Sequence, residues 1–336
     1  MDLGVKPRGK LAHNTWVQNI FSVFQITFPF FALVLCGYLA TRKGYLPLPA
    51  IGGMNSFVLF FALPCLLFRF GSSTPIAQLL DWNVVLVYLF CAFVMVGFTI
   101  AITKGNRIGW NDASFGALVA AFPNTGFMGV PLLVALLGAK AAGPVIQTIM
   151  IDMLITSSLC IALSRLDGAE EHGFRNAVKK SIKGVFTNPM PWAILLGALL
   201  SATEMTLPKP VAVTLGLLAD AASPVALFTI GAVLARSDMN IHDKVPMRDF
   251  MPVAFLKLFL HPLLVLLVGT TAKQLGASLD NYALTVLVLA AALPSASNVS
   301  LLAERMGANN GRVAKIILFS TALAFISFSV AVAIFR

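Results

Sequence analysis

Two short stretches decide the fold of this chain: AFPNTG at residues 121–126 and LPSASN at residues 293–298. Each lies inside an apolar run long enough to cross a membrane as a helix. Because proline lacks a backbone N–H and clashes with the preceding turn, each stretch is expected to break its helix. Broken backbone at membrane depth is tolerated only where it is buried in protein or lines a cavity. The two stretches therefore predict two broken helices that meet inside the protein.

The composition is that of a membrane protein. Hydrophobic residues make up 58% of the 336 residues and charged residues only 11%, whereas about a quarter of the residues in soluble domains are charged. The net charge of +10 does not indicate nucleic-acid binding, because the basic residues gather in loops between apolar runs. The four cysteines lie in apolar runs with no CxxC pair and no cluster of metal ligands. We therefore expect no metal site and no cofactor.

The apolar runs predict ten membrane-spanning helices arranged as two repeats of five. One repeat covers residues 1–164, a cytoplasmic linker covers 165–187, and the second repeat covers 188–336. Because five is an odd number, the second repeat enters the membrane from the opposite side, which makes it an inverted repeat. The predicted helices cover about residues 20–40, 51–70, 83–103, 115–137, 144–164, 188–202, 211–235, 251–272, 281–305 and 313–335.

Lysine and arginine predict the orientation. The loops after helices 1, 3, 5, 7 and 9 hold 15 of these residues, and the other side holds 8. Loops rich in lysine and arginine stay in the cytoplasm. Both termini are therefore expected on the non-cytoplasmic side, although Lys6, Arg8 and Lys10 near the N-terminus oppose this orientation.

The two breaks carry the candidate substrate-binding residues. A broken helix exposes the N-terminus of its second half, where free N–H groups and partial positive charge suit a carboxylate or another small anion. Paired interruptions at matching places are typical of a transporter's binding site. The alternative is a pair of proline kinks whose polar groups merely cap the freed backbone. The candidates are Pro123, Asn124, Thr125, Gly126, Pro294, Ser295, Ser297 and Asn298.

Few ionisable residues lie within the predicted helices: Asp152, Asp220, Lys257 and His261. A charge at mid-bilayer costs at least about 2.5–3.5 kcal/mol, so such residues are functional candidates. We expect them to couple transport to H⁺ or Na⁺, with Lys257 as a counter-charge to Asp152 or to an anionic substrate. The alternatives are that Lys257 extends its ammonium to the membrane surface and that His261 is a neutral partner of freed backbone. Asp152, Asp220 and His261 are expected at similar depth.

The residues around the breaks resemble the auxin efflux carrier family. FPNTGFMGVPL at 122–132 is similar to the helix 4 signature of that family, LPSASN at 293–298 to its helix 9, and KLFLHPLL at 257–264 to its helix 8. The resemblance implies an all-α fold like that of bacterial bile acid:sodium symporters, with helices 4 and 9 crossing at the substrate site. It also implies a scaffold domain of helices 1, 2, 6 and 7, a transport domain of helices 3, 4, 5, 8, 9 and 10, an elevator motion and a homodimer.

The same resemblance predicts a carrier of small organic anions in the inner membrane. The short central loop and the lack of an acidic residue in helix 2 favour the bacterial organic-acid branch, with malonate and malate permeases, over an auxin-like exporter of indole carboxylates. The alternatives are a sodium-coupled symporter of the bile acid type, a channel, and a regulatory membrane protein without turnover. We expect no enzyme, because neither Asp152 nor Asp220 lies in the Gly-x-Gly-Asp context of an intramembrane protease.

Overall fold

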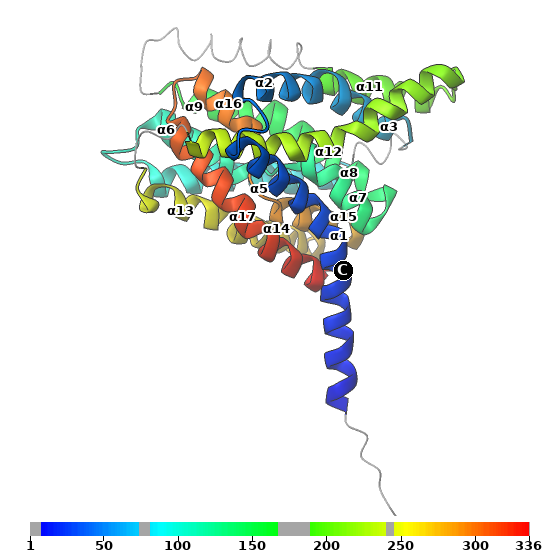
Figure 1. Ribbon diagram of the computed structural model, residues 1–336. Helices are drawn as coiled ribbons and strands as arrows, with labels where there is room; N and C mark the ends of the chain where they lie inside the picture. Colours follow the sequence, from blue (N-terminus) through cyan, green and yellow to red (C-terminus); the bar gives the residue numbers. More distant parts are fainter. Residues whose placement is uncertain (1–7, 74–80, 167–188, 240–244, 336) are drawn as a thin grey trace, which may run out of the picture.

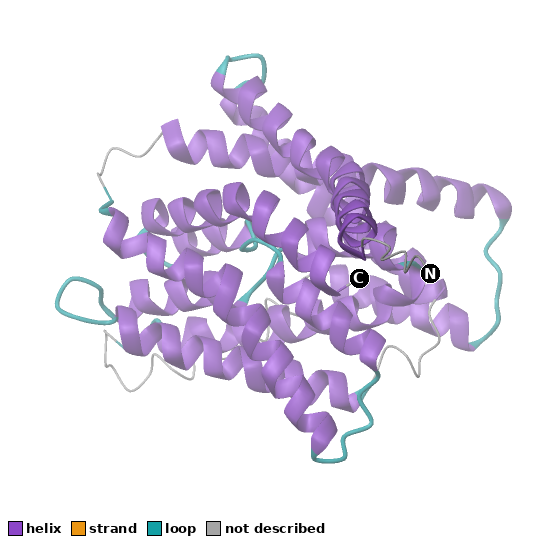
Figure 2. Ribbon diagram, turned by 90° about the horizontal axis from the view of Figure 1, so that it is seen from below, coloured by secondary structure: helices purple, strands orange, loops and turns teal. Residues whose placement is uncertain are grey.

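The computed structural model of the protein describes residues 8–73, 81–166, 189–239 and 245–335. Within these ranges the chain is built from helices and contains no β-strand (Figure 1 and Figure 2). The prediction of an all-helical membrane protein is confirmed. Residues 167–187 of the predicted linker lie outside the described residues.

Among the described residues, six helices are long and apolar enough to span a membrane, and they match predicted helices 2, 3, 5, 7, 8 and 10. Three of them are composite, because a π-helical turn joins two α-helical parts. The six are α2–η1–α3 (Leu48–Phe57, Val58–Ala62, Leu63–Ser73), α5 (Trp82–Thr103), η3–α8–η4–α9 (Ala139–Ala141, Ala142–Ile151, Asp152–Thr156, Ser157–Leu163), α12 (Lys209–Met239), α13–η5–α14 (Met247–Phe255, Leu256–Leu260, His261–Gln274) and α17 (Asn310–Phe335).

The other helices are α1 (Arg8–Arg42), α11 (Pro189–Ala202) and two interrupted pairs. The first pair is α6 (Trp110–Ala121), which is followed by the π-turn η2 (Thr125–Gly129) and α7 (Val130–Leu137). The second pair is α15 (Asn281–Ala292) and α16 (Asn298–Arg305). The interruptions fall at the two predicted proline-containing stretches.

The first halves of the interrupted pairs form the centre of the molecule. Residues 113–121 of α6 and 286–292 of α15 are all buried. These segments are apolar on every side, as expected for a helix that is surrounded by protein. The breaks at their ends are therefore enclosed by other helices, where backbone groups need partners from the protein.

Two pairs of helices touch backbone to backbone through glycine. In the α1–α12 pair, a Cβ atom on Gly37 would lie 1.9 Å from the carbonyl oxygen of Phe228. In the α3–α11 pair, a Cβ atom on Gly197 would lie 2.3 Å from the carbonyl oxygen of Phe68. Any larger residue would push these helices apart. Figure 1 shows α1 against α12, with the N-terminal part of α1 extending beyond the other helices.

These two helix contacts have the same residue spacing. Gly231 approaches the carbonyl oxygen of Val34 in the α1–α12 pair, and Gly71 approaches that of Ile194 in the α3–α11 pair. Each of these residues in the α1–α12 contact has a counterpart in the α3–α11 contact whose residue number differs by 160. Gly37 and Gly197, for example, differ by 197 − 37 = 160. The matched positions are Val34 and Ile194, Gly37 and Gly197, Phe68 and Phe228, and Gly71 and Gly231.

Candidate substrate site

The two breaks are hydrogen-bonded to each other through their backbones. The Asn124 N–H donates to the carbonyl of Pro294 at 2.8 Å, and the Ala296 N–H donates to the carbonyl of Phe122 at 3.0 Å. These bonds form an isolated antiparallel bridge between Pro123 and Ser295. Groups freed by proline in one helix are thereby satisfied by the other helix, as buried backbone requires.

Glycine allows this close approach. A Cβ atom on Gly129 would lie 2.8 Å from Cδ1 of Leu293, next to the second break. Gly126 is half-buried, and the only atom near its Cβ position is Cδ2 of Leu63 at 4.0 Å. Of these two glycines, Gly129 is therefore the one that the contact between the breaks requires.

Two of the predicted substrate-binding residues stabilise the breaks themselves. The hydroxyl of Ser295 donates to the carbonyl of Val119 at 2.7 Å, and its N–H donates to the hydroxyl of Ser320 at 3.2 Å. The hydroxyl of Thr125 lies 3.4 Å from the carbonyl of Pro123. Ser295 and Thr125 are fully buried. Their side chains thus cap backbone carbonyls at the breaks, which is the role that the alternative of simple proline kinks gives to these polar groups.

A pocket lies on one side of the second break. Ser297 and Asn298 form one wall, at the start of α16. The opposite wall is a single face of α12, whose residues recur at the spacing of a helix, i, i+3, i+4 and i+7. The lining residues are Asn55, Phe127, Ala226, Thr229, Ile230, Val233, Ser297 and Asn298.

Two buried amide oxygens around the breaks have no hydrogen-bond partner among the described residues: Oδ1 of Asn124 and Oδ1 of Asn298. Asn124 is 3% exposed, so its side chain is enclosed by the protein. Buried polar groups without partners are rare, because each costs about 1–3 kcal/mol. Both asparagines were predicted to bind substrate, and both retain unused hydrogen-bonding capacity.

Three of the four candidate coupling residues belong to a buried polar cluster. Asp152 accepts hydrogen bonds from the Tyr88 hydroxyl at 2.8 Å and the Thr156 hydroxyl at 3.1 Å. Lys257 lies 3.1 Å from Nδ1 of His261. Asp152, Lys257 and His261 are fully buried. Asp152 begins the π-turn η4 and Lys257 lies within the π-turn η5, a type of irregularity that is frequent at functional sites.

Lys257 connects this cluster to the second break. Its ammonium donates to the carbonyl of Ala291 at 2.6 Å. Ala291 is in the last turn of α15, where unpaired carbonyls and the helix dipole attract a cation. Lys257 is therefore buried against the broken helix, and the alternative that its ammonium extends to the membrane surface is wrong.

Asp220 is not part of this cluster. It is exposed, and its carboxylate pairs with Nη1 of Arg69 at 2.7 Å. Asp220 therefore lies on an exposed face of α12 and is not joined to Asp152 and His261. An exposed ion pair of this kind has a weak effect on stability.

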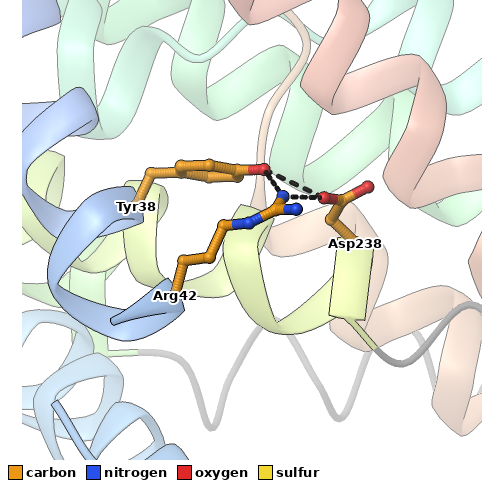
Figure 3. Close-up of polar contacts among 3 residues, drawn as sticks. All are labelled: Tyr38, Arg42 and Asp238. Atoms are coloured by element: carbon orange, nitrogen blue, oxygen red, sulfur yellow. Dashed lines mark hydrogen bonds and ion pairs between the residues drawn. The ribbon is translucent and has the colours of Figure 1, made fainter. Parts of the chain in front are cut away.

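Sequence reasoning missed the pocket wall and one ionic group at the end of α12. Asn55 and Thr229 are polar residues like several others in their helices, so the sequence alone did not single them out. Tyr38, Arg42 and Asp238 join the ends of α1 and α12, with Nη1 of Arg42 2.8 Å from Asp238 and the Tyr38 hydroxyl 2.9 Å from it (Figure 3). This group stabilises the helix that forms the pocket wall.

Among the described residues, no three histidine, cysteine, aspartate or glutamate side chains are grouped so that they could hold a metal ion. The polar groups around the breaks are amides and hydroxyls. Such groups, together with the N-terminus of a half-helix, suit an anion.

The chain matches known membrane transport proteins over most of its length. The profile of a family described as "Membrane transport protein" matches residues 22–332. A protein of Rhizobium meliloti (strain 1021) named "Putative malonate transporter" is 28% identical over 302 residues, which cover 89% of this chain and 91% of the relative. "Uncharacterized transporter YfdV" of Escherichia coli (strain K12) is 28% identical, with 82% and 86% covered. "Auxin efflux carrier component 8" of Arabidopsis thaliana is 23% identical, with 83% and 88% covered.

These matches confirm the family resemblance that was read from the broken helices. The family and these relatives are transporters and not enzymes. The chain therefore belongs to the membrane transport protein family, which includes the auxin efflux carriers.

Proposed function

We propose that this transporter is a secondary carrier of small organic anions, chiefly carboxylates, which bind where the two broken helices meet. The observation that carries this proposal is the polar pair Ser297 and Asn298 at the start of α16, which lines a small pocket of about 10 Å³ together with one face of α12. The N-terminus of a half-helix, the Ser297 hydroxyl and the N–H₂ group of the Asn298 amide are donors that suit a carboxylate. The similarity to a protein named as a malonate transporter supports the same substrate class.

We propose that the described helices belong to a ten-helix inverted repeat. The repeats cover residues 1–164 and 188–336, and a linker covers 165–187. Broken helices 4 and 9 are proposed to cross at the bridge between Pro123 and Ser295. The glycine contacts support this arrangement, because a repeat that maps helix 1 onto 6 and helix 2 onto 7 also maps the α1–α12 contact onto the α11–α3 contact. The constant spacing of 160 positions is what such a repeat requires.

The proposed mechanism is an elevator motion. Helices 1, 2, 6 and 7, which are α1, α2–α3, α11 and α12, form the scaffold, and the helices that carry the breaks and the buried cluster move against it. The pocket supports this division, because Asn55, Thr229 and the other α12 residues come from the scaffold and Phe127, Ser297 and Asn298 from the moving part. We also propose a homodimer, as the family resemblance implies.

The proposed orientation in the inner membrane has both termini on the non-cytoplasmic side. The test uses single cysteines in a cysteine-free protein, at Leu275 between α14 and α15 and at Tyr45 after α1. These residues are 83% and 82% exposed, so each position is accessible from its own side. We expect an impermeant thiol reagent added to whole cells to label Leu275→Cys and to leave Tyr45→Cys unlabelled. The reverse pattern would show that the orientation is inverted.

We propose that Asp152, Lys257 and His261 couple substrate movement to a proton. The hydrogen bond from Lys257 to Ala291 supports this, because a change of charge in the cluster acts directly on the broken helix. Asp152→Asn is expected to flatten the pH dependence of uptake while it retains exchange of labelled for unlabelled substrate. Asp220→Asn is the matched control, because Asp220 is an exposed aspartate outside the cluster. A pH profile that is unchanged in Asp152→Asn, or one flattened equally by both variants, would rule out this role.

The sodium-coupled alternative predicts that uptake requires sodium. No acidic residue lines the pocket, and this favours the proton as the coupling ion, because sodium prefers carboxylate and carbonyl oxygens. Uptake that is equal in sodium and potassium buffers at one pH is the expected result. A strict sodium requirement would favour the bile acid symporter mechanism.

A panel of labelled substrates in proteoliposomes tests the proposed function. Malonate, malate, acetate and indole-acetate are compared at a fixed pH with the purified full-length protein. We expect saturable uptake of malonate or another small carboxylate, and weak uptake of indole-acetate. Preferred uptake of indole-acetate would support the auxin-like alternative, and no uptake of any carboxylate would refute the proposal.

A further inference from the structure

The pocket contains no ionisable side chain. Its eight lining residues are apolar residues, two asparagines, one threonine and one serine, and the structure describes all of them. On the helices that line it, Asp238 pairs with Arg42 and Asp220 with Arg69. Arg236 in α12 and Glu304 and Arg305 in α16 are outside the lining as well. A ligand in this pocket therefore meets dipoles and hydrogen-bonding groups but no full counter-charge.

The buried cluster of Asp152, Lys257 and His261 does not supply a counter-charge to the pocket. Lys257 donates to the carbonyl of Ala291 on the α15 side of the break and contacts His261. Asp152 is held by the hydroxyls of Tyr88 and Thr156. None of these residues lines the pocket.

One carboxylate fits this environment and a second does not. A helix N-terminus is equivalent to roughly half of a positive charge, and here the Ser297 hydroxyl and the N–H₂ group of the Asn298 amide stand beside it as hydrogen-bond donors. These groups can hold one carboxylate. A second carboxylate would lie against Ala226, Ile230 and Val233 without a positive partner, and burial of an unpaired charge is strongly unfavourable.

The opposite wall offers a hydrogen-bond acceptor. The Thr229 hydroxyl donates its only proton to the carbonyl of Val225 at 2.6 Å. A hydroxyl has one donor and two acceptor lone pairs, so Thr229 presents acceptor sites to the pocket. Thr229 is 3% exposed, which leaves bulk water little room to satisfy these lone pairs. A neutral O–H or N–H group on the ligand fits this position.

We infer that the carrier selects monoanions, and that it binds a dicarboxylate only as the half-protonated acid. The carboxylate lies at Ser297 and Asn298, and the neutral donor group lies toward Thr229. This inference rests on the proposed function and narrows its substrate class from small carboxylates to singly charged ones with a hydrogen-bond donor. It also assigns Thr229, on the scaffold wall, as a specificity-determining residue.

The test measures how unlabelled acids inhibit the exchange of labelled malonate in proteoliposomes that contain the full-length protein, with equal pH on both sides. Malonamate has one carboxylate and an N–H donor at every pH above the titration of its single carboxyl, whereas malonate becomes a dianion as its second carboxyl loses its proton. The ratio of the two half-inhibitory concentrations cancels any pH dependence of the carrier itself. Above the pH at which the second carboxyl of malonate titrates, we expect the half-inhibitory concentration of malonate to rise about tenfold per pH unit relative to that of malonamate.

The donor position is tested with monomethyl malonate, which has one carboxylate and no donor. Wild-type protein is expected to prefer malonamate to monomethyl malonate about tenfold. Thr229→Val should abolish this preference, and Thr229→Ser, which keeps the hydroxyl, should retain it. If Thr229→Val does not yield a monodisperse protein, the wild-type pH series remains decisive.

A malonate-to-malonamate ratio that stays constant, or that favours malonate as the pH rises, would overturn the inference and leave the proposed function intact. Exclusion of malonate even at low pH, while acetate is carried, would also overturn it. If no carboxylate is exchanged at any pH, the proposed function itself fails.

Discussion

Asn298→Ala is expected to lower carboxylate uptake about 10- to 100-fold. Asn298 lines the pocket, where the N–H₂ group of its amide can donate to a carboxylate. A hydrogen bond to a charged group contributes about 1.5–3 kcal/mol, which corresponds to this loss. Adding Ser297→Ala to Asn298→Ala removes both polar groups of the wall and is expected to abolish uptake. The measurement is initial uptake of labelled malonate in proteoliposomes.

Stability separates this effect from simple unfolding. Asn298→Ala removes an amide whose oxygen has no partner among the described residues, so the melting temperature of the purified protein should change little. Ser295→Ala is the matched control, because the hydroxyl of Ser295 already donates to Val119. We expect Ser295→Ala to lower the melting temperature more than Asn298→Ala does. Wild-type uptake by Asn298→Ala would place the substrate elsewhere.

Gly231→Val is expected to destabilise the protein by about 3 kcal/mol and to prevent its accumulation as a monodisperse species. A Cβ atom at this position would lie 1.9 Å from the carbonyl oxygen of Val34, so α1 and α12 must separate. Overpacking of this kind typically costs 1–3 kcal/mol, and here the obstacle is rigid backbone and not a side chain that can rotate. The measurement is thermal stability in detergent by size-exclusion chromatography.

Gly216→Val in the same helix is the control, because no atom lies within 4 Å of its Cβ position. Gly71→Val, the counterpart of Gly231→Val in the α3–α11 contact, should be destabilising as well. If Gly231→Val were as stable as Gly216→Val, the close contact between α1 and α12 would be wrong.

The sequence predicted the features that depend on local chemistry. The prolines at 123 and 294 locate the breaks, because proline affects its own helix wherever that helix packs. The scarcity of ionisable residues in apolar runs identified Asp152, Lys257 and His261, because burial of a charge is costly in any such position.

The features that depend on which helices become neighbours could not be predicted. Asn55 and Thr229 are ordinary polar residues until α12 is placed opposite the second break. The depth of Asp220 along the chain did not reveal that it faces outward to Arg69. The glycines of the helix contacts gave no local signal, because their role depends on a partner 123 to 197 residues away in the chain (194 − 71 and 231 − 34).

Counterflow of malonate tests the central claim most directly, namely that the pocket at the broken helices is the substrate site of a carrier. Proteoliposomes are loaded with unlabelled malonate and diluted into a trace of labelled malonate. A carrier with one alternating site is expected to accumulate label transiently above its equilibrium level, and the Ser297→Ala, Asn298→Ala protein is expected not to. If the label in wild-type proteoliposomes only approaches equilibrium, without an overshoot, the protein is a channel. An overshoot that survives in the double variant would contradict the assignment of the site.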